Sequence, residues 1–368
     1  MSNIKKINLK KLIVLFKGNF DYLVRSRLMP LPPKHLSINV TYRCNSRCKM
    51  CNIWQYEHKK EMSLQEIVKV LEDPIFDHVE DLAINGGEPT LRKDVVDIVA
   101  SCIKRMGRLD SITYNTNGFL TDRIVRIVKR TALLCNEKNI HFTVHVSLDG
   151  VGKIHDIIRG VNRAFEKTTR TINELKKIKD EYGFFLGTSC VVSKMNIDYL
   201  GELEQWREKE ELGQGYILVG FHDTYVNNLD KQDELGFNFT QSKEKVIRFL
   251  KKRAKEKSLM NFQAFHWNDL YNMIVHAKKR QTICPLIVDG AAFDTWGNVS
   301  YCLSEPSIGN LKTDGSFGKI YYSKENLAKK AKIRTKRCPE CESGCMVDIG
   351  VRNNILLYLK FLLFSRIK

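Results

Sequence analysis

The chain has 368 residues, 43% apolar and 28% charged, which is the composition of a globular protein with one large domain and a smaller one. No run of about 18 or more apolar residues occurs, which excludes a membrane-spanning helix, and no secretory signal is recognised, so we expect a cytoplasmic protein. The net charge of +18 favours acidic partners. No basic motif is interleaved with aromatic residues, and no nucleic-acid partner is expected.

Residues 1–35 form a basic, apolar segment that ends in prolines. Its apolar residues fall at helical spacing between lysines, and the prolines then end any helix. A second apolar segment, 351–368, has basic residues at its tip and is expected to be helical. Each segment is too short to span a bilayer. The alternatives are peripheral contact with an anionic membrane surface, or packing of both segments against the rest of the protein.

Between these segments, predicted strands alternate with predicted helices. The strands are 36–41, 79–84, 111–115, 141–148, 184–192 and 216–221. The helices are 63–71, which opens with a capping box, then 94–105, 121–135, 164–181, 199–211 and 241–257. Repeated strand–helix units predict a parallel α/β sheet with right-handed crossovers, and six units are too few for a closed eight-stranded barrel. In such sheets, functional residues lie at the carboxyl ends of the strands.

The pattern changes after about residue 260. Residues 289–302 predict a short β-hairpin, and a cysteine-rich loop follows it. We therefore expect four segments, with limits at 1–35, 36–259, 260–350 and 351–368. The second is the α/β domain, and the third is a smaller domain that carries the later cysteines.

Three cysteines follow the first predicted strand. Cys44, Cys48 and Cys51 are spaced Cys-x3-Cys-x2-Cys, and thiolates at this spacing suit an iron–sulfur cluster. A cubane cluster has four irons, so three cysteines leave one iron open to a small molecule. The alternative is a zinc knuckle, which needs a fourth ligand nearby, and His58 is the local candidate.

Polar residues and glycines follow the next two strands. The second strand ends in Gly86-Gly87-Glu88-Pro89. The glycines allow close backbone approach to a ligand, Glu88 can accept from an ammonium group, and Pro89 stiffens the turn. The third strand ends in Asn115-Thr116-Asn117-Gly118, for which a simple Asn-Gly turn is the alternative.

The fourth strand ends in Ser147 and is followed by several charged residues. Arg159 has the planar fork that matches a carboxylate. For Asp149 and for His155-Asp156, turn formation and helix capping are the favoured interpretation.

A second group of cysteines lies toward the other end of the chain. Cys284 and Cys302 flank a glycine, with the spacing Cys-x12-Gly-x4-Cys, and Cys338, Cys341 and Cys345 follow as Cys-x2-Cys-x3-Cys. Without a secretory signal, spaced cysteines indicate metal ligands rather than disulfides. A zinc ribbon is the alternative to a second iron–sulfur cluster.

Together these motifs resemble the radical S-adenosylmethionine (radical SAM) superfamily over roughly residues 36–350. The resemblance implies an open, partial (β/α)6 TIM-like barrel with a small C-terminal cysteine-rich domain of the SPASM or twitch type. It implies a 4Fe–4S cluster on Cys44, Cys48 and Cys51 that binds S-adenosylmethionine (SAM). It also implies one auxiliary 4Fe–4S cluster on Cys284, Cys302 and two of Cys338, Cys341 and Cys345. The implied SAM contacts are Met50, Gly86, Gly87, Glu88, Pro89, Asn117, Ser147 and Arg159.

The activity that the resemblance implies is reductive cleavage of SAM to a 5′-deoxyadenosyl radical that abstracts a substrate hydrogen. Flavodoxin or ferredoxin is the expected electron donor, and the outcome is oxidation or epimerisation of the substrate. In an epimerisation, Cys190 on the fifth strand is a candidate hydrogen donor. A non-peptide substrate is expected: a glycan, a lipid-linked compound or another small molecule. The alternatives are a peptide-modifying maturase and a non-catalytic zinc-binding protein.

Overall fold

The computed structural model describes residues 16–57, 59–237, 240–258, 261–344 and 346–365. The chain divides into two compact units. The sheet unit comprises residues 32–243 and 290–326, and the basic unit comprises residues 1–31, 244–289 and 327–368. By sequence, the basic unit has 27 Lys and Arg against 8 Asp and Glu, whereas the sheet unit has 33 against 34. The whole positive excess of the chain therefore belongs to the basic unit.

The sheet unit contains one nine-stranded sheet in the order β6-β5-β4-β3-β2-β1-β7-β8-β9. Its strands are β1 (His35–Asn39), β2 (Asp81–Asn85), β3 (Ser111–Thr116), β4 (His141–Ser147), β5 (Phe185–Val192), β6 (Gly213–Leu218), β7 (Gly290–Asp294), β8 (Asn298–Ser300) and β9 (Gly309–Asn310). Strands β1 to β6 are parallel neighbours in chain order, as the strand–helix pattern predicts. The carboxyl ends of all six strands therefore meet at one edge.

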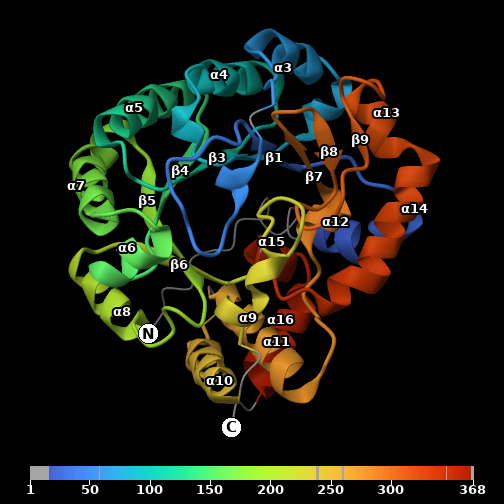
Figure 1. Ribbon diagram of the computed structural model, residues 1–368. Coiled ribbons are helices and arrows are strands. Elements are labelled where there is room, and N and C mark those ends of the chain that lie inside the picture. The colour runs from blue at the N-terminus through green and yellow to red at the C-terminus, as the bar shows by residue number, and fades with distance from the viewer. Residues whose placement is uncertain (1–15, 58, 238–239, 259–260, 345, 366–368) are drawn as a thin grey trace, which may run out of the picture. The chain divides into compact units, whose positions relative to one another are not determined.

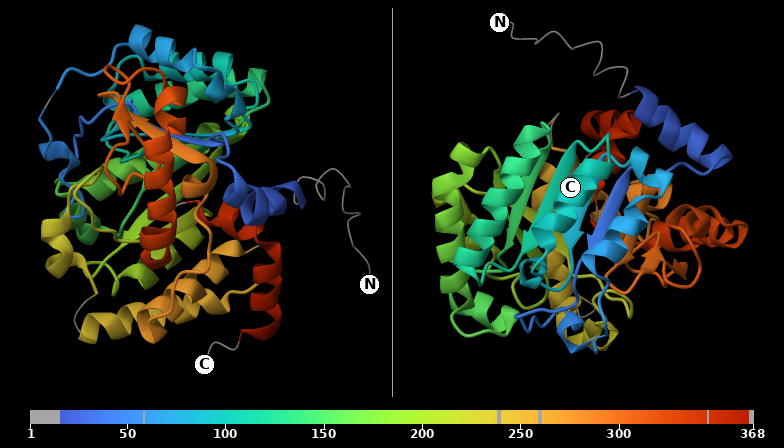
Figure 2. Two further views of the ribbon diagram at one scale, coloured as in Figure 1. Left: turned by 90° about the vertical axis from the view of Figure 1, so that its right-hand side faces the viewer. Right: turned by 90° about the horizontal axis from the view of Figure 1, so that it is seen from above.

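Helices connect these strands and lie along the outside of the curved sheet (Figures 1 and 2). They are α3 (Leu64–Leu71), α4 (Val95–Arg105), α5 (Thr121–Glu137), α6 (Lys153–Arg159), α7 (Ala164–Tyr182) and α8 (Leu200–Lys209). The predicted capping box is confirmed: the Ser63 side chain accepts from the backbone of Glu66, whose carboxylate accepts from the backbone of Ser63. Alternate residues of β2 and β3 are buried, which is the period-2 pattern of a β-strand with one face in the core.

The remaining elements are shorter or lie nearer the end of the chain. The α-helices are α2 (Ser26–Leu28), α9 (Gln232–Leu235), α10 (Thr240–Lys255), α11 (Phe262–His276), α12 (Pro285–Asp289), α13 (Phe317–Tyr322), α14 (Lys324–Lys332), α15 (Val347–Arg352) and α16 (Ile355–Phe364). The 3-10 turns are η2 (Ile53–Gln55), η3 (Pro74–His78), η4 (Pro89–Leu91), η5 (Leu229–Lys231) and η7 (Cys338–Glu340), and the π-helical turns are η1 (Asp21–Arg25) and η6 (Ile333–Arg337).

The predicted hairpin within residues 289–302 forms, but it extends the sheet. Strand β7 pairs with β1 in parallel, and β8 pairs with β7 in antiparallel. The segment predicted as a separate domain, 260–350, is therefore shared between the two compact units. The predicted limits of the four segments were placed by sequence motifs, and they stay predictions.

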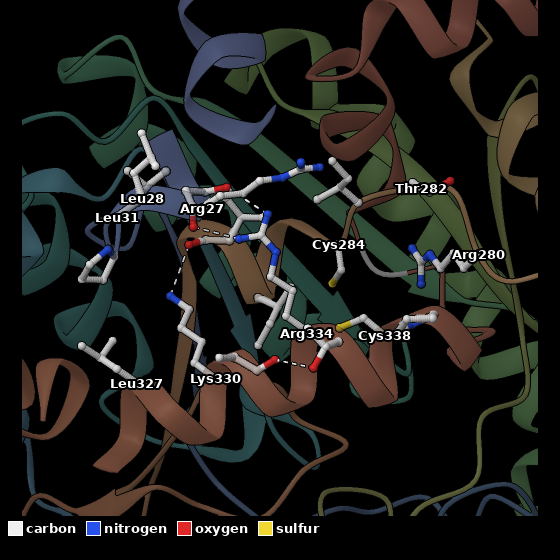
Figure 3. Close-up of a pocket in the computed structure, with 18 of the residues that line it drawn as sticks. Arg27, Leu28, Leu31, Arg280, Thr282, Cys284, Leu327, Lys330, Arg334 and Cys338 are labelled. Carbon is white, nitrogen blue, oxygen red and sulfur yellow. Dashed lines mark hydrogen bonds between the residues drawn. The ribbon is translucent and has the colours of Figure 1, made fainter. Parts of the chain in front are cut away.

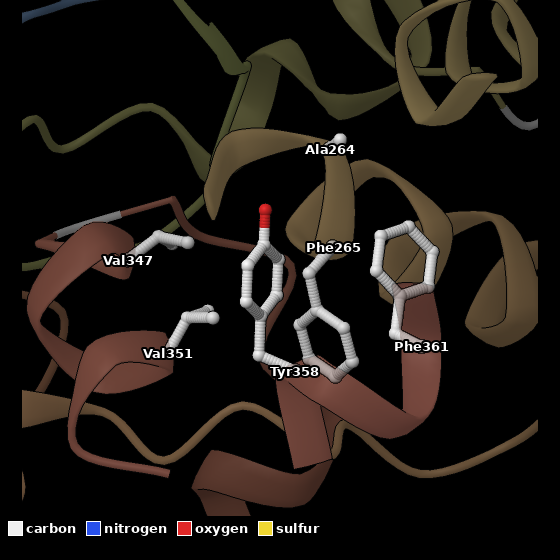
Figure 4. Close-up of a cluster of buried hydrophobic side chains, with 6 residues drawn as sticks. All are labelled: Ala264, Phe265, Val347, Val351, Tyr358 and Phe361. Atoms are coloured by element: carbon white, nitrogen blue, oxygen red, sulfur yellow. The ribbon is translucent and has the colours of Figure 1, made fainter. Parts of the chain in front are cut away.

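The basic unit has its own core, built where α16 packs against α11 and α15 (Figure 4). Ala264 and Phe265 of α11 meet Tyr358 and Phe361 of α16 there. The Phe265 and Phe361 rings pack edge to face with centroids 5.3 Å apart. The helical prediction for 351–368 is thus confirmed for the described part of that segment. Among the described residues, no helix is long and apolar enough to cross a membrane.

Candidate functional site

A cavity of about 380 Å³ lies in the sheet unit at the carboxyl ends of the strands. Its walls come from the cysteine loop (residues 43–52) and from the ends of β2 to β6. The predicted site residues that line it are Cys44, Cys48, Met50, Cys51, Gly86, Gly87, Asn117, Ser147, Arg159 and Cys190. Two predicted residues, Glu88 and Pro89, are not among the lining residues. The structure thus brings together residues that the sequence separates by more than a hundred positions.

The end of α6 holds one side of the cysteine loop. The Arg47 and Lys49 amides donate to the carbonyls of Arg159 (2.9 Å) and Ile158 (2.8 Å). Gly160, which ends α6 in the left-handed conformation, makes this approach possible: a Cβ there would lie 2.3 Å from the Arg47 carbonyl oxygen. A glycine is therefore required for contact as well as for backbone conformation.

Gly160→Ala is expected to destabilise the sheet unit by about 2–4 kcal/mol, because it adds an overpacking cost to the left-handed strain of alanine. Gly183→Ala is the matched control. Gly183 ends α7 with nearly the same dihedrals, but its Cβ would make only an ordinary 3.4 Å contact with Asn136. We expect about 1–2 kcal/mol for the control, measured by urea unfolding followed by circular dichroism. Equal losses in the two variants would show that the Arg47 contact is unimportant.

The loop after β2 supports the other side of the cysteine loop. The Gly87 and Glu88 amides donate to the carbonyls of Thr41 (2.7 Å) and Arg43 (2.8 Å). A Cβ on Gly87 would lie 2.3 Å from the Arg43 oxygen. The two glycines therefore serve close approach to the cysteine loop, in addition to the ligand contact for which the motif was singled out.

A third support comes from the segment after β6, which sequence reasoning did not connect with the site. The Asn228 side chain donates to the Met50 carbonyl (2.8 Å), and the Asn52 amide donates to the Val226 carbonyl (2.8 Å). The Tyr225 hydroxyl donates to the Gly86 carbonyl (2.7 Å). The backbone of the cysteine loop is thus fixed on three sides before any ligand binds.

The three thiols lie in a setting that suits iron–sulfur ligation. The Ser46 amide points to the Cys44 sulfur (3.4 Å), and Arg159 Nη1 donates to the Cys48 sulfur (3.6 Å). Such bonds to sulfur tune iron–sulfur clusters. Burial raises the pKa of Cys44 and of Cys51 to about 12, so both thiols are protonated until a metal binds and releases the protons.

A buried ion pair fixes Arg159 beside the cysteines. Its Nε lies 2.7 Å from Oδ2 of Asp149, whose carboxylate is fully buried. Oδ1 of Asp149 accepts from the Val191 amide (2.9 Å). Burial raises the pKa of Asp149, and Arg159 opposes that rise. The interpretation of Asp149 as a turn or capping residue was therefore wrong: it orients Arg159 and ties β4 to β5.

His155 and Asp156 are structural, as the favoured interpretation predicts. The Asp156 carboxylate accepts from the Phe165 amide at the start of α7, which is a capping contact. His155 is buried, and Nδ1 accepts from the Asp149 amide (3.1 Å). Burial and the nearby Arg159 hold its pKa well below its usual value, so the imidazole is neutral and Nε2 carries the proton toward Thr168 (3.4 Å).

Glu88 is turned into the protein. Its carboxylate accepts from the Asn117 amide (2.7 Å), the Thr116 hydroxyl (2.9 Å) and the Thr90 hydroxyl (2.6 Å). Burial raises its pKa, and these bonds oppose the rise. In this arrangement Glu88 joins the ends of β2 and β3 and places Asn117, which does line the cavity. The direct contact with an ammonium group stays a prediction.

His145, which belongs to a row of polar side chains on the strands, was missed. Asn115 donates to Asn85 (2.8 Å), and His145 is the register partner of Asn115 on the next strand. All three line the cavity. In the part of the chain that the structure describes, neither Nδ1 of His145 nor Nε1 of the lining residue Trp54 has a hydrogen-bond partner, and both atoms are buried. Burial lowers the pKa of His145, so its imidazole is neutral. The available signal was the two-residue spacing of His145 and Ser147, which places both on one face of β4.

A second cavity, of about 620 Å³, lies in the basic unit (Figure 3). Cys284 and Cys338 line it with their thiols turned toward each other. Arg280 holds the neighbouring cysteine segment by donating to the carbonyls of Cys341 (3.3 Å) and Ser343 (2.9 Å). Its Nε and Nη2 are buried, and neither has a hydrogen-bond partner among the described residues. Such donors suit the sulfurs of an anionic cluster.

The other predicted auxiliary ligands are placed differently. Cys302 follows β8 in the sheet unit, and Cys345 lies outside the described residues. His58, the proposed fourth ligand of a zinc knuckle, also lies outside them. Among the residues that the structure describes, no three His, Cys, Asp or Glu side chains converge on a site for a single metal ion. A cubane cluster does not require such convergence, because each thiolate binds its own iron. The three thiols of the first cavity fit an iron–sulfur cluster on these grounds, and the second cavity supplies two thiols toward another.

Comparison with known proteins agrees with this geometry. Residues 38–206 match the family model described as the radical SAM superfamily. Among curated proteins, the chain is 26% identical over 219 residues to Fe-coproporphyrin III synthase from Methanosarcina barkeri, which covers 59% of this chain and 51% of that protein. It is 30% identical over 139 residues to GTP 3′,8-cyclase from Haemophilus influenzae, which covers 36% of this chain and 41% of the cyclase. The chain spans about half the length of the curated relatives it matches.

Two solved structures share the fold. SuiB from Streptococcus suis, bound to S-adenosylmethionine, has a TM-score of 0.57 at 17% identity and covers 94% of this chain and 80% of its own. The structure of anSMEcpe with bound AdoMet has a TM-score of 0.56 at 18% identity and covers 89% of this chain and 95% of its own. The predicted partial barrel is confirmed by these folds and by the parallel sheet.

Proposed function

We propose that this chain, whose residues 38–206 match the radical SAM family model, is an enzyme that cleaves SAM reductively and removes a hydrogen atom from its substrate. The observation that carries the proposal is the cavity lined by Cys44, Cys48, Cys51 and the predicted SAM contacts other than Glu88 and Pro89. When bound, the 4Fe–4S cluster would supply the one electron that splits SAM into methionine and a 5′-deoxyadenosyl radical, and that radical would take hydrogen from a substrate carbon.

The protein's own residues hold and orient these groups. In the proposal, Cys44, Cys48 and Cys51 hold the cluster, and Arg159 is aimed by Asp149 at the cluster edge and the carboxylate of SAM. Asn117 and Ser147 line the adjoining wall. Apolar side chains from Ile53, Ile217 and Val219 complete the lining and limit access of water.

We further propose one auxiliary 4Fe–4S cluster, held by Cys284, Cys302 and two of Cys338, Cys341 and Cys345. Its support is the pair of thiols that line the second cavity and the unpartnered donors of Arg280. The reaction belongs to the reducing cytoplasm, with flavodoxin or ferredoxin as the electron donor.

The proposed substrate is a non-peptide molecule that carries hydroxyl or amide groups. Asn85, Asn115 and the unpartnered Nδ1 of His145 offer it donors and acceptors inside the cavity. Oxidation and epimerisation are both open to such a substrate, and Cys190, which lines the cavity, is placed to return hydrogen in an epimerisation. A peptide is the second candidate, because SuiB, which shares this fold, has been solved bound to precursor peptide SuiA.

Anaerobic reconstitution with iron and sulfide tests the proposal. The protein should hold about eight irons, from two cubanes of four, and with SAM and a strong reductant it should release 5′-deoxyadenosine. Glycans and lipid-linked sugars, compared with peptides, should then accelerate release above the substrate-free rate. A colourless protein that binds zinc and releases no 5′-deoxyadenosine would refute the enzyme assignment. About four irons would refute the auxiliary cluster alone.

A further inference from the structure

The basic unit exposes large apolar side chains on two of its segments. Residues 16–28, which are helical and include η1 and α2, expose Phe16, Phe20, Val24 and Leu28. These residues recur every four positions and therefore follow one side of the helix. Leu28 is 81% exposed and Phe16 is 73% exposed. On the other side, Tyr22 is buried and its hydroxyl donates to Asp289 (2.8 Å), so the segment is anchored by its inner face.

The second segment is α16, which has the same construction. Tyr358 and Phe361 point into the core of the basic unit (Figure 4), while Leu356, Leu359 and Leu363 are exposed. The spacing of these leucines places them on one face of the helix, around Lys360. Folding requires apolar residues only on the inner face of this helix, so the core of the basic unit does not account for the exposed leucines.

The two segments meet at the start of α16 (Figure 2). The Asn19 side chain accepts from the Ile355 amide (3.0 Å) and donates to the Arg352 carbonyl (3.2 Å). Their exposed side chains thus belong to one region of the basic unit, which we call the apolar patch (residues 16–29 and 356–364). Of the 19 large apolar residues exposed in the described structure, 9 lie in these two stretches. Such concentration marks an interaction surface.

Charge identifies the partner. The patch belongs to the unit with a net charge of +19, and exposed Lys17, Arg27, Arg352 and Lys360 lie within or beside it. Within residues 16–31 and 352–365 the sole acidic residue is Asp21, which is buried. An aliphatic surface ringed by cations suits the interface of an anionic bilayer, where leucine and phenylalanine enter the acyl region and cations meet the headgroups. Nucleic acid would leave the leucines without a partner.

We propose that the basic unit binds anionic membrane surfaces through the apolar patch, with both helices lying in the lipid interface. At 10 residues, α16 is about 15 Å long and can lie in one leaflet without crossing it. This binding is independent of the chemistry at the strand ends. It would place the enzyme at the surface where a lipid-linked substrate resides.

The test is co-sedimentation of the full-length holoprotein with vesicles under anaerobic conditions. Binding is expected to phosphatidylglycerol-rich vesicles at low salt, weaker at high salt, and at least about tenfold weaker to pure phosphatidylcholine. Two double variants, Phe16→Gln with Phe20→Gln and Leu356→Gln with Leu363→Gln, should each weaken binding about tenfold. Because Tyr358 and Phe361 form core contacts, surface substitutions are preferred to removal of α16.

The matched control is Leu133→Gln with Leu229→Gln, which replaces two exposed leucines of the sheet unit. It should bind vesicles as the parent does. All variants should release 5′-deoxyadenosine at the parental rate, which shows that they are folded. The proposal is overturned if the parent ignores anionic vesicles, or if the patch variants bind as well as the control. It is also overturned if sedimentation velocity shows a dimer that the patch variants dissociate while vesicles bind nothing, because the patch then meets a second copy.

Discussion

Cys48→Ala is expected to abolish the release of 5′-deoxyadenosine, whereas Cys302→Ala should retain part of it. Cys48 lines the same cavity as Ser147 and Arg159, and it is the cysteine to which Arg159 donates. Its loss removes a ligand from the cluster that would bind SAM. Cys302 belongs to the other predicted cluster, so its loss should uncouple SAM cleavage from substrate turnover without stopping cleavage.

Iron analysis and product release measured on the same samples check this division. Replacement of Cys44, Cys48 and Cys51 together should lower the iron content from about eight to about four per chain. Cys102→Ala serves as the matched control, because Cys102 is a buried thiol on α4 and lines neither cavity. Equal loss of cleavage in Cys48→Ala and Cys302→Ala, with circular dichroism unchanged, would contradict the assignment of separate roles.

The second large effect, a loss of folding stability, is expected from Asp149→Asn. The amide keeps an acceptor for the Val191 amide but leaves the buried Arg159 guanidinium without its counter-charge. Removing one partner of a buried pair costs about 3–5 kcal/mol, a large share of the stability of most domains. The variant should therefore unfold at a much lower urea concentration, and its cysteine loop should retain less iron.

Glu166→Gln is the control for charge removal. Glu166 pairs with Arg163 on the exposed surface of α7, where water screens both charges, and we expect no change in the unfolding midpoint. A second variant, Asp149→Asn with Arg159→Met, removes both charges and keeps side chains of similar size, so it distinguishes the effect of an unpaired charge from that of lost packing. It should recover part of the stability because no unpaired buried charge remains, yet it should still fail to orient SAM. If Asp149→Asn were as stable as the control, the ion pair would have no structural role.

The order and type of the elements could be predicted because local signals determine them. Strands β2 and β3 alternate buried and half-buried residues, and α3 begins with a capping box that needs only four consecutive residues. The pairing of β7 with β1 could not be predicted in this way. Residues near 290 carry the signal of a hairpin, and nothing local tells a hairpin that stands alone from one that continues a parallel sheet.

The candidate site likewise has features that local sequence determines and features that only long-range packing determines. The cysteine spacing and the residues after each strand could be recognised because their pattern is contiguous. Asp149 was misinterpreted because its partners, Arg159 and the Val191 amide, are set by packing between β4, β5 and α6. His145 was missed because a histidine inside a strand is unremarkable until its neighbours across the sheet are known.

The contacts that hold the cysteine loop also bear on how the protein is made. Met50 and the Asn228 side chain that fixes its carbonyl are 178 residues apart in the chain. At about 5–20 residues per second, a ribosome adds that length in roughly 10–35 s. Throughout this interval the three cysteines belong to a loop whose last support has not yet been synthesised. The cysteine loop therefore cannot reach its final backbone until residue 228 of the 368 has been made, and iron–sulfur assembly in the cell would meet a chain that is more than half complete.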